Sequence, residues 1–259
     1  MSFMVANYVS ANYGWLKAPD GCTAQVTLKP GKNQDGYMTN EDILSQLKVV
    51  AALVKEIYPD NNHYFIYDNA TTHLKRPDGS LSVRCTPKEE STVFGVDISK
   101  RDSEGSIIPG EKQQMAMHGA SFNGEPQPLY FPPDDGIGMG KFKGMERILA
   151  EQGIETTGLK AECKKFKCTP PQRDCCMQRI LYNEPDFQNV ESNLEILARS
   201  LGVQVIFLPK YHCELNFIEQ CWGYAKRLYR LNPESSREDV LEKNTLEALD
   251  AVPLVSMRR

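Results

Sequence analysis

The sequence of 259 residues predicts an α/β fold in which a mixed sheet is flanked by helices and interrupted by a long insertion. Three observations support this fold class. Residues 1–74 contain two β-prone segments, a helical pattern and a third β-prone segment, and residues 187–232 contain a helix, a strand and a helix. Alternating strands and helices are typical of layered α/β domains. Residues 75–186 interrupt the alternation, and residues 233–259 add a C-terminal helix and tail.

The first two β-prone segments predict an antiparallel pair. Phe3–Ser10 and Ala24–Lys29 are rich in strand-forming residues, and a Pro-Asp-Gly turn signal lies between them. We therefore expect a hairpin with a long loop.

A helix is expected after this hairpin, with its apolar positions between Ile43 and Ile57. Apolar side chains recur there at helical spacing, Thr39 or Asn40 can cap the start, and Pro59 follows the end. The next segment, His63–Tyr67, is apolar on both faces, which predicts a strand buried in the centre of the sheet.

The insertion at residues 75–186 is rich in proline, glycine, lysine and aspartate, and we expect little regular structure in it. Val93–Ser99 is β-prone, and Ser103–Pro109 suggests a turn that leads into a further strand. Met145–Gln152 is typical of a short helix that Gly153 ends.

Helical and strand patterns return after the insertion. Val190–Leu201 carries apolar residues at helical spacing before Gly202, and Val203–Leu208 reads as a strand. We expect a helix from near Asn216 to about Arg230, and a last helix that Ser236 caps and that runs to about Ala251.

Two of these elements carry carboxylates suited to metal-ion chemistry. Asp68 begins the segment Asp-Asn-Ala-Thr-Thr-His directly after the predicted central strand, and ligands of open α/β sheets gather at such strand ends. Glu219 lies in the first turn of the predicted helix at 216–230, so its side chain can reach back over the strand ends. Simpler interpretations stay open, since Asp68 can form an Asx turn and Glu219 can be favoured by the helix dipole.

The two segments together resemble those of mariner-type transposases. That family shows an Asp-Asn-Ala-x-x-His segment and, later, a Pro-x-Tyr-x-x-(Asp/Glu)-Leu-Asn-x-Ile-Glu-x-x-Trp segment. The resemblance covers roughly residues 1–74 and 187–232, and the long insertion is similar to that of fungal members. The matching residues are Asp68, Asn69, Ala70 and His73 in the first segment, and Pro209, Tyr211, Glu214, Leu215, Asn216, Ile218, Glu219 and Trp222 in the second.

The resemblance implies a ribonuclease-H-like fold and a DDE endonuclease that cuts DNA and joins 3′-hydroxyls to target DNA. In such sites carboxylates hold two Mg²⁺ (or Mn²⁺) ions about 3.5–4 Å apart. Asp68 would bridge the two ions and Glu219 would bind one of them. Asn69 and His73 would not bind the ions themselves but would orient the ligands or shape the loop that carries them.

The expected partner is DNA. Lys226, Arg227 and Arg230 follow Glu219 by about two and three helical turns, so they could contact phosphates beside the site. A solvated basic face is the alternative, and the net charge of −4 argues against strong nonspecific DNA binding. The sequence shows no secretion signal and no apolar run long enough for a membrane span. We expect a nuclear protein and a homodimer as a candidate assembly.

Three departures from the family pattern shape the expected activity. The family's first catalytic aspartate lies on a strand before the hairpin, and Phe3–Ser10 holds no carboxylate. The family's N-terminal helix-turn-helix is also absent. Asp68 and Glu219 are separated by 150 residues, many more than in the family. We therefore expect an N-terminally truncated domain, weakly active or inactive, whose sheet has an open edge in place of the first strand.

Two alternatives to this function stay open. One is a noncatalytic nucleic-acid-binding or protein-interaction module on the same scaffold, which the missing first aspartate favours. The other is a different nuclease of the same fold, which would need a third acidic side chain close to Asp68 and Glu219.

Eight cysteines in a chain without a secretion signal are expected to stay reduced. Four of them cluster in the insertion: Cys163, Cys168, Cys175 and Cys176. Their spacing is compatible with a structural Zn²⁺ site but is not that of a standard zinc knuckle. Buried or free cysteines without metal are the alternative. Cys85, Cys213 or His118 could replace a missing ligand.

Overall fold

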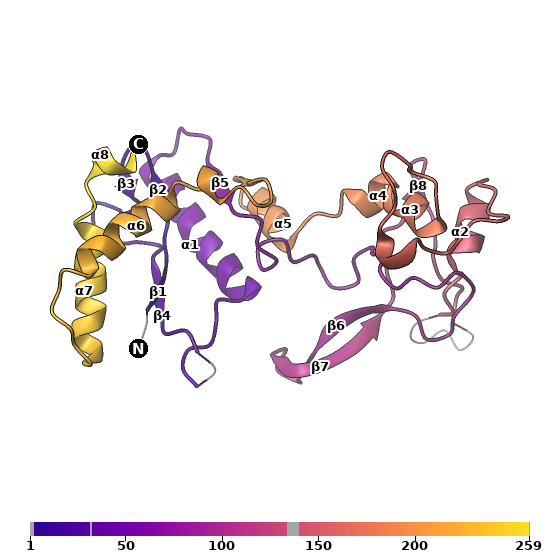
Figure 1. The fold of residues 1–259 in the computed structure, drawn as a ribbon, viewed down its shortest axis with the longest axis horizontal. Helices are drawn as coiled ribbons and strands as arrows, with labels where there is room; N and C mark the ends of the chain where they lie inside the picture. The colour runs from indigo at the N-terminus through magenta and orange to yellow at the C-terminus, as the bar shows by residue number, and fades with distance from the viewer. Residues whose placement is uncertain (1–2, 32, 134–139, 259) are drawn as a thin grey trace. The chain divides into compact units, whose positions relative to one another are not determined.

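The chain divides into two compact units in a computed structural model that describes residues 3–31, 33–133 and 140–258 (Figure 1). Unit 1 comprises Met1–Lys75 and Ser192–Arg259, and unit 2 comprises Arg76–Glu191. Unit 2 thus takes in nearly all of the segment expected as an insertion, together with residues 187–191. The C-terminal segment from residue 233 belongs to unit 1.

The fold is mixed α/β with small sheets. The described residues form eight α-helices and five two-stranded sheets, without a single sheet that joins them. Unit 1 holds three of the strand pairs. They are β1 (Met4–Ala6) with β4 (Val26–Leu28), antiparallel; β2 (Val9–Ser10) with β3 (Gly14–Trp15), antiparallel; and β5 (Tyr64–Tyr67) with β10 (Gln204–Phe207), parallel.

The long hairpin expected at the start of the chain is present, but its first strand is divided. Met4 of β1 pairs with Leu28 of β4, as expected for the hairpin. Residues 7–8 then leave the ladder, and Val9 pairs with Trp15 of β3 instead. One continuous β-prone segment therefore contributes to two separate strand pairs.

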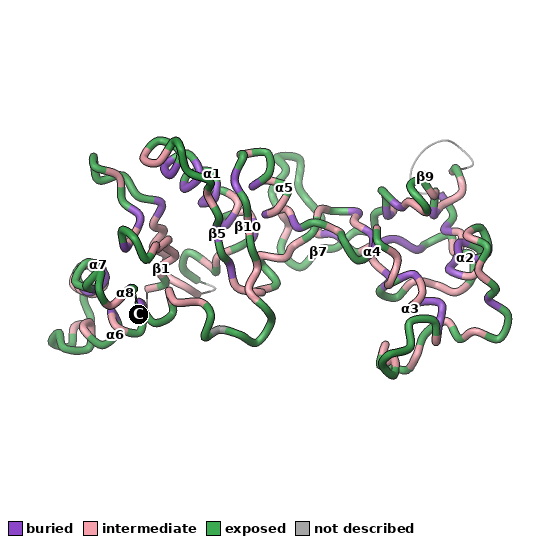
Figure 2. The backbone as a smooth tube through the Cα atoms, turned by 90° about the horizontal axis from the view of Figure 1, so that it is seen from above, coloured by how far each residue is buried: buried purple, intermediate pink, exposed green. Residues whose placement is uncertain are grey.

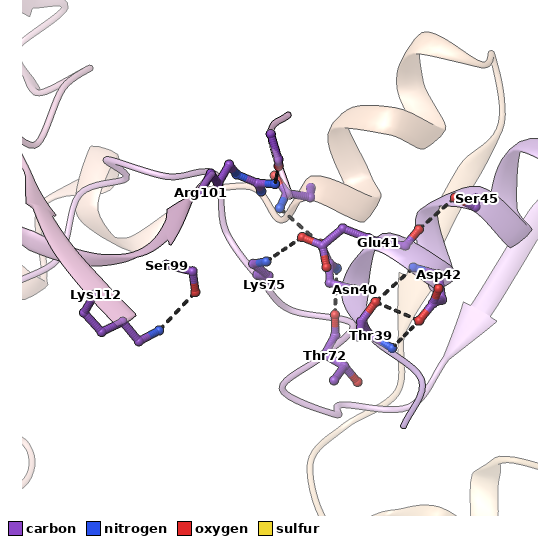
Figure 3. Close-up of polar contacts among 12 residues, drawn as sticks. Thr39, Asn40, Glu41, Asp42, Ser45, Thr72, Lys75, Ser99, Arg101 and Lys112 are labelled. Carbon is purple, nitrogen blue, oxygen red and sulfur yellow. Dashed lines mark hydrogen bonds and ion pairs between the residues drawn. The ribbon is translucent and has the colours of Figure 1, made fainter. Parts of the chain in front are cut away.

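Helix α1 (Asn40–Ile57) organises the core of unit 1. Thr39 caps it in a reciprocal capping box with Asp42, which settles the choice between Thr39 and Asn40 (Figure 3). Asn40 instead donates a side-chain hydrogen bond of 2.7 Å to the carbonyl of Thr72. Leu47 and other apolar residues of the inner face pack against β5 and against α5 (Asn193–Ser200).

Strand β5 is buried on one face only, which corrects the expectation of a central strand covered on both sides. Phe65 and Tyr67 point into the core and are each 8 % exposed. Tyr64 and Ile66 alternate with them and are 52 % and 55 % exposed. Figure 2 shows β5 beside β10 in a backbone coloured by burial. A short apolar run cannot reveal from sequence whether a second layer covers its outer face.

The C-terminal part of unit 1 continues from β10 into four short helical elements: η2 (Cys213–Leu215), α6 (Ile218–Tyr229), α7 (Glu238–Asp250) and α8 (Leu254–Met257). A small apolar cluster joins α6 and α7 through Cys221, Ala225 and Leu249. The sequence predicted Ser236 as the cap of the last long helix, but α7 starts after Arg237, which makes no side-chain cap bond.

Unit 2 corrects the expectation of an insertion with little regular structure. Its elements are β6 (Val96–Arg101), β7 (Ile107–Met115), β8 (Ser121–Phe122), β9 (Glu125–Pro126), α2 (Met145–Glu151), η1 (Lys164–Phe166), α3 (Met177–Tyr182) and α4 (Pro185–Gln188). Phe142 and Leu149, with no exposed surface, lie in an apolar core of its own. Because these apolar residues lie far apart in the sequence, they show no periodic pattern.

A substitution in α1 tests the packing of unit 1. Leu47 has no exposed surface, so Leu47→Ala should lower the free energy of unfolding of this unit by roughly 2–5 kcal/mol. Val49 on the same helix is 52 % exposed, and Val49→Ala should change this free energy by about 0.5 kcal/mol or less. Urea titration, with hydrogen exchange at unit 1 amides, measures both effects. Equal effects would contradict the described core.

Candidate functional site

Asp68 lies at the carboxyl end of β5 and is held in place from two sides. Its Oδ1 accepts a hydrogen bond of 3.2 Å from the backbone N–H of Ala70, which forms the Asx turn considered from the sequence. The Nδ1 of His73 lies 2.6 Å from the same Oδ1. The His73 ring in turn packs edge-on against Tyr67. Both contacts fall on Oδ1, so the turn orients the carboxylate while Oδ2 stays available to a ligand.

Asn69 ties the ends of the two parallel strands together. Its Nδ2 donates a hydrogen bond of 3.3 Å to the carbonyl of Leu208, the residue after β10. The N–H of Leu208 donates back across the pair to the carbonyl of Tyr67 at 2.8 Å. The carboxyl ends of β5 and β10 therefore meet at one fixed edge, where α/β sheets commonly bind ligands.

Glu219 lines the same cavity as Asp68, although 150 residues lie between them. It occupies the first turn of α6 and is exposed, and its backbone N–H donates to the carbonyl of Asn216 at 3.0 Å. Its carboxylate makes no side-chain hydrogen bond or ion pair with any described residue. The cavity has a volume of about 480 Å³. Both sequence segments singled out above contribute to its lining: Asp68, His73, Leu215, Asn216, Ile218, Glu219 and Trp222.

The cavity separates two strand edges that have no partner among the described residues. Residues 6–11 line one side and residues 63–68 line the other. β1 pairs only with β4, and β5 pairs only with β10, within the part of the chain that the structure describes. β5 therefore has an unpaired edge among the described residues. Because every strand of a two-stranded sheet has such an edge, this does not test the expectation of a mixed sheet that lacks its first strand.

A pair of tyrosines bridges this cavity. The hydroxyls of Tyr8 and Tyr67 are hydrogen-bonded at 2.5 Å, and the Tyr8 ring packs edge-on against Phe65. Burial raises the pKa of Tyr67 to about 12 and also raises the pKa of Tyr8, so both hydroxyls stay protonated. Sequence reasoning missed this pair, because no local pattern connects residues so far apart.

The three basic residues expected to contact phosphates are all exposed on α6 and its end. Lys226 lines a neighbouring cavity of about 710 Å³, which His73 and Glu219 also line. Arg227 instead stacks over the ring of Tyr224 at 4.4 Å. Arg230 is the C-cap of α6. Lys226 and Glu219 thus line one cavity, whereas the Arg227 side chain packs on the Tyr224 ring of the same helix.

Trp222 also lines both cavities, and it packs partly buried against the apolar cluster of α6 and α7. Its indole N–H is buried and has no hydrogen-bond partner among the described residues. A buried donor without a partner is unfavourable, and this N–H is one of the few such groups among the described residues.

No third acidic side chain of the described residues forms a metal-binding group with Asp68 and Glu219. Among residues 3–31, 33–133 and 140–258, the one group of three or more cysteine, histidine, aspartate or glutamate side chains close enough for metal binding is the cysteine cluster. The alternative of a different nuclease with its own third carboxylate therefore has no support in these residues.

The cysteine cluster itself is in unit 2. The sulfur atoms of Cys163, Cys168, Cys175 and Cys176 all lie within 4.8 Å of one another, so the cluster could hold a metal ion. Burial raises the pKa of the Cys175 thiol to about 12, and hydrogen bonds from neighbouring thiols act in the same direction. Cys85 and His118 are not part of the group; the side chain of Cys213 lies outside the described structure.

Comparison with known proteins adds no relative: no family model, no curated protein and no solved structure matches the chain. Among the described helices, none is both long and apolar enough to cross a lipid bilayer.

The tyrosine bridge can be measured by a double-mutant cycle. Tyr8→Phe and Tyr67→Phe each remove one hydroxyl of the pair and leave the rings in place. The coupling free energy between the two substitutions should be about 0.5–1.5 kcal/mol, because each hydroxyl satisfies the other. Urea unfolding of the four proteins gives this value. Strictly additive effects would show that the two hydroxyls do not interact in solution.

Proposed function

We propose that this chain is a DDE-type endonuclease or integrase domain of transposase ancestry with a ribonuclease-H-like fold, as its resemblance to the mariner-type family implies. One observation carries the proposal. Asp68 and Glu219, which the two family-like segments supply, line the same cavity at the carboxyl end of β5. In this proposal the two carboxylates bind Mg²⁺ or Mn²⁺, and the substrate is DNA.

The chemistry of the donors fits such ions, since carboxylate oxygens are the ligands that Mg²⁺ prefers. Asp68 presents Oδ2, because its turn and His73 engage Oδ1. Glu219 is exposed and can reorient toward the cavity. When bound, the ions would activate the attacking oxygen and stabilise the leaving oxygen of a phosphodiester. His73 and Asn69 hold the loop that carries Asp68 against the strand ends.

Completion of the site requires a further carboxylate. The unpaired edges of β1 and β5 flank the cavity, so an extended segment that carries an acidic residue would fit between them and pair with both. Two carboxylates alone bind divalent ions weakly, and the activity of these residues by themselves is low.

In this proposal the protein contacts DNA through a few basic residues near the cavity. The net charge of −4 gives no general attraction to a polyanion. Lys226 shares a cavity with Glu219, so it would hold a phosphate next to the metal-binding carboxylates, and the exposed Arg230 would extend this contact. A nuclear location and a homodimer, in which each copy brings one site to DNA, belong to the same proposal.

The second candidate function is a noncatalytic nucleic-acid-binding or protein-interaction module on this scaffold. The absence of a third acidic group near Asp68 and Glu219, within the described residues, favours it. The two candidates differ in whether the cavity binds a divalent ion and whether DNA is cut.

Metal binding can be tested without catalysis. Mn²⁺ added to the labelled protein should broaden the nuclear magnetic resonance signals of the Ala70 amide and the Trp222 indole, because both lie beside the proposed ligands. Asp68→Asn combined with Glu219→Gln should abolish this broadening. Asp60→Asn, which removes an exposed carboxylate outside the cavity, should leave it unchanged. Broadening that persists in the double variant would refute binding at this site.

DNA cleavage tests the enzyme itself. We expect slow Mn²⁺-dependent nicking of supercoiled plasmid, reduced to background by Asp68→Asn or by Glu219→Gln and kept by Asp60→Asn, since the ions need both carboxylates. Cleavage unaffected by either substitution would indicate a contaminating nuclease and contradict the proposal. No cleavage by any protein, with no local Mn²⁺ broadening, would establish the noncatalytic module instead.

A further inference from the structure

We propose that Cys163, Cys168, Cys175 and Cys176 bind one Zn²⁺ ion through four thiolates, and that this ion holds the loop between α2 and α3 in its folded form. The proposal concerns unit 2 alone and does not depend on the function proposed for the cavity of unit 1.

The spacing of the sulfur atoms matches tetrahedral zinc. Zn–S bonds of about 2.3 Å in a regular tetrahedron place neighbouring sulfurs about 3.8 Å apart. The sulfurs of Cys163 and Cys175 are 3.7 Å apart, and those of Cys168 and Cys176 are 4.0 Å apart. A disulfide would need about 2.05 Å. Two of the six separations therefore match a shared tetrahedral ion, and the other four stay within 4.8 Å.

The backbone between the first two cysteines is bent sharply to achieve this. Lys165 and Phe166 both adopt left-handed conformations, with φ of 56° and 54°. The turn is closed by a hydrogen bond of 2.7 Å from the N–H of Phe166 to the carbonyl of Cys163. Left-handed conformations of non-glycine residues are unfavourable and persist only where the surroundings hold them. A bound ion that joins Cys163 to Cys168 supplies such a constraint.

The start of α3 positions the adjacent residues Cys175 and Cys176. Cys176 is fully buried and is the extended N-cap of this helix. The N–H groups of Met177 and Gln178 donate to the carbonyls of Lys160 and Ala161 at 3.0 Å. These bonds place the start of α3 against the chain that leads into Cys163. Both sulfurs of the pair thus reach the cluster, although neighbouring side chains often diverge.

The surroundings of the cluster suit a zinc–thiolate group. Four thiolates and Zn²⁺ would carry a net negative charge, and the Arg179 guanidinium lies within hydrogen-bonding reach of the Cys168 sulfur. The Arg179 side chain is held over the rings of Phe166 and Tyr182. Its Nε–H is buried and has no partner among the described residues, so it can donate to a thiolate.

The ion in this site is structural. Four protein ligands fill the tetrahedral coordination of zinc, so no position stays open for a substrate. Thiolates are soft ligands that select zinc over Mg²⁺ or Mn²⁺. The loop at residues 152–176 contains little regular structure and few buried side chains, so packing alone contributes little to its order.

Metal analysis of the purified full chain tests the proposal. We expect about one zinc ion per chain in the wild-type protein, and a cobalt-substituted form with the absorption of tetrahedral cobalt–thiolate. Cys168→Ser and Cys175→Ser should each reduce zinc to less than about one tenth of that content. Cys85→Ser is the matched control, since Cys85 is an exposed cysteine of the same unit outside the cluster, and it should keep the zinc.

A second measurement applies to the wild-type chain and avoids variants that fail to fold. Removal of zinc by a chelator should speed tryptic cleavage after Lys164, Lys165 and Lys167 by about tenfold or more, and added zinc should reverse this. The proposal would be overturned if the wild-type protein takes up no zinc after reconstitution while the thiols of the four cluster cysteines can still be alkylated. A mass reduced by the hydrogens lost in disulfide formation would overturn it as well. Neither result would affect the Mn²⁺ experiment on unit 1.

Discussion

The parallel pairing of β5 with β10 is the interaction on which the candidate site of this protein depends. These strands lie on opposite sides of unit 2 in the sequence, and their register fixes Tyr67 opposite Phe207. The Asn69–Leu208 hydrogen bond then joins the loops that follow them. Because the loop-closure entropy grows only logarithmically with length, a compact unit between the strands costs this pairing little. Asp68 and Glu219 can therefore share a cavity even though the chain between them forms a separate core.

The same pairing leaves one edge of β5 without a ladder partner among the described residues. An unpaired edge exposes backbone donors and acceptors, which proteins usually cover or pair. Here the Tyr8–Tyr67 hydrogen bond spans the cavity between that edge and the β1–β2 segment, so side chains substitute for backbone pairing. Two neutral hydroxyls with raised pKa values make this contact insensitive to pH in the neutral range. An incoming extended segment would have to displace it, which makes the tyrosine pair a barrier to occupation of the cavity.

Local sequence signals predicted the helices and strands themselves better than they predicted what packs against them. Thr39 and its capping box, the hairpin, and the strand before Asp68 follow from residues within a few positions of one another. The exposure of Ile66 does not follow from neighbouring residues in the sequence, because it depends on what lies over the outer face of β5. The core of unit 2 escaped prediction for a similar reason, since its apolar residues come from distant short segments. The carboxylates and cysteines could be named from motifs and spacing, but the shared cavity and the sulfur distances depend on tertiary structure.

The two candidate metal sites differ in ligand hardness, and this difference has a consequence for how the chain behaves with mixed ions. Unit 1 offers carboxylate oxygens at Asp68 and Glu219, whereas unit 2 offers four sulfurs. Oxygen ligands suit Mg²⁺ and Mn²⁺, and thiolates suit Zn²⁺. If both proposals hold, four thiolates would bind zinc far more tightly than two carboxylates, so zinc at low concentration would fill unit 2 and leave unit 1 to the abundant hard ions. Order in the cysteine loop and divalent-ion binding at the cavity would then depend on different ions and could be varied independently.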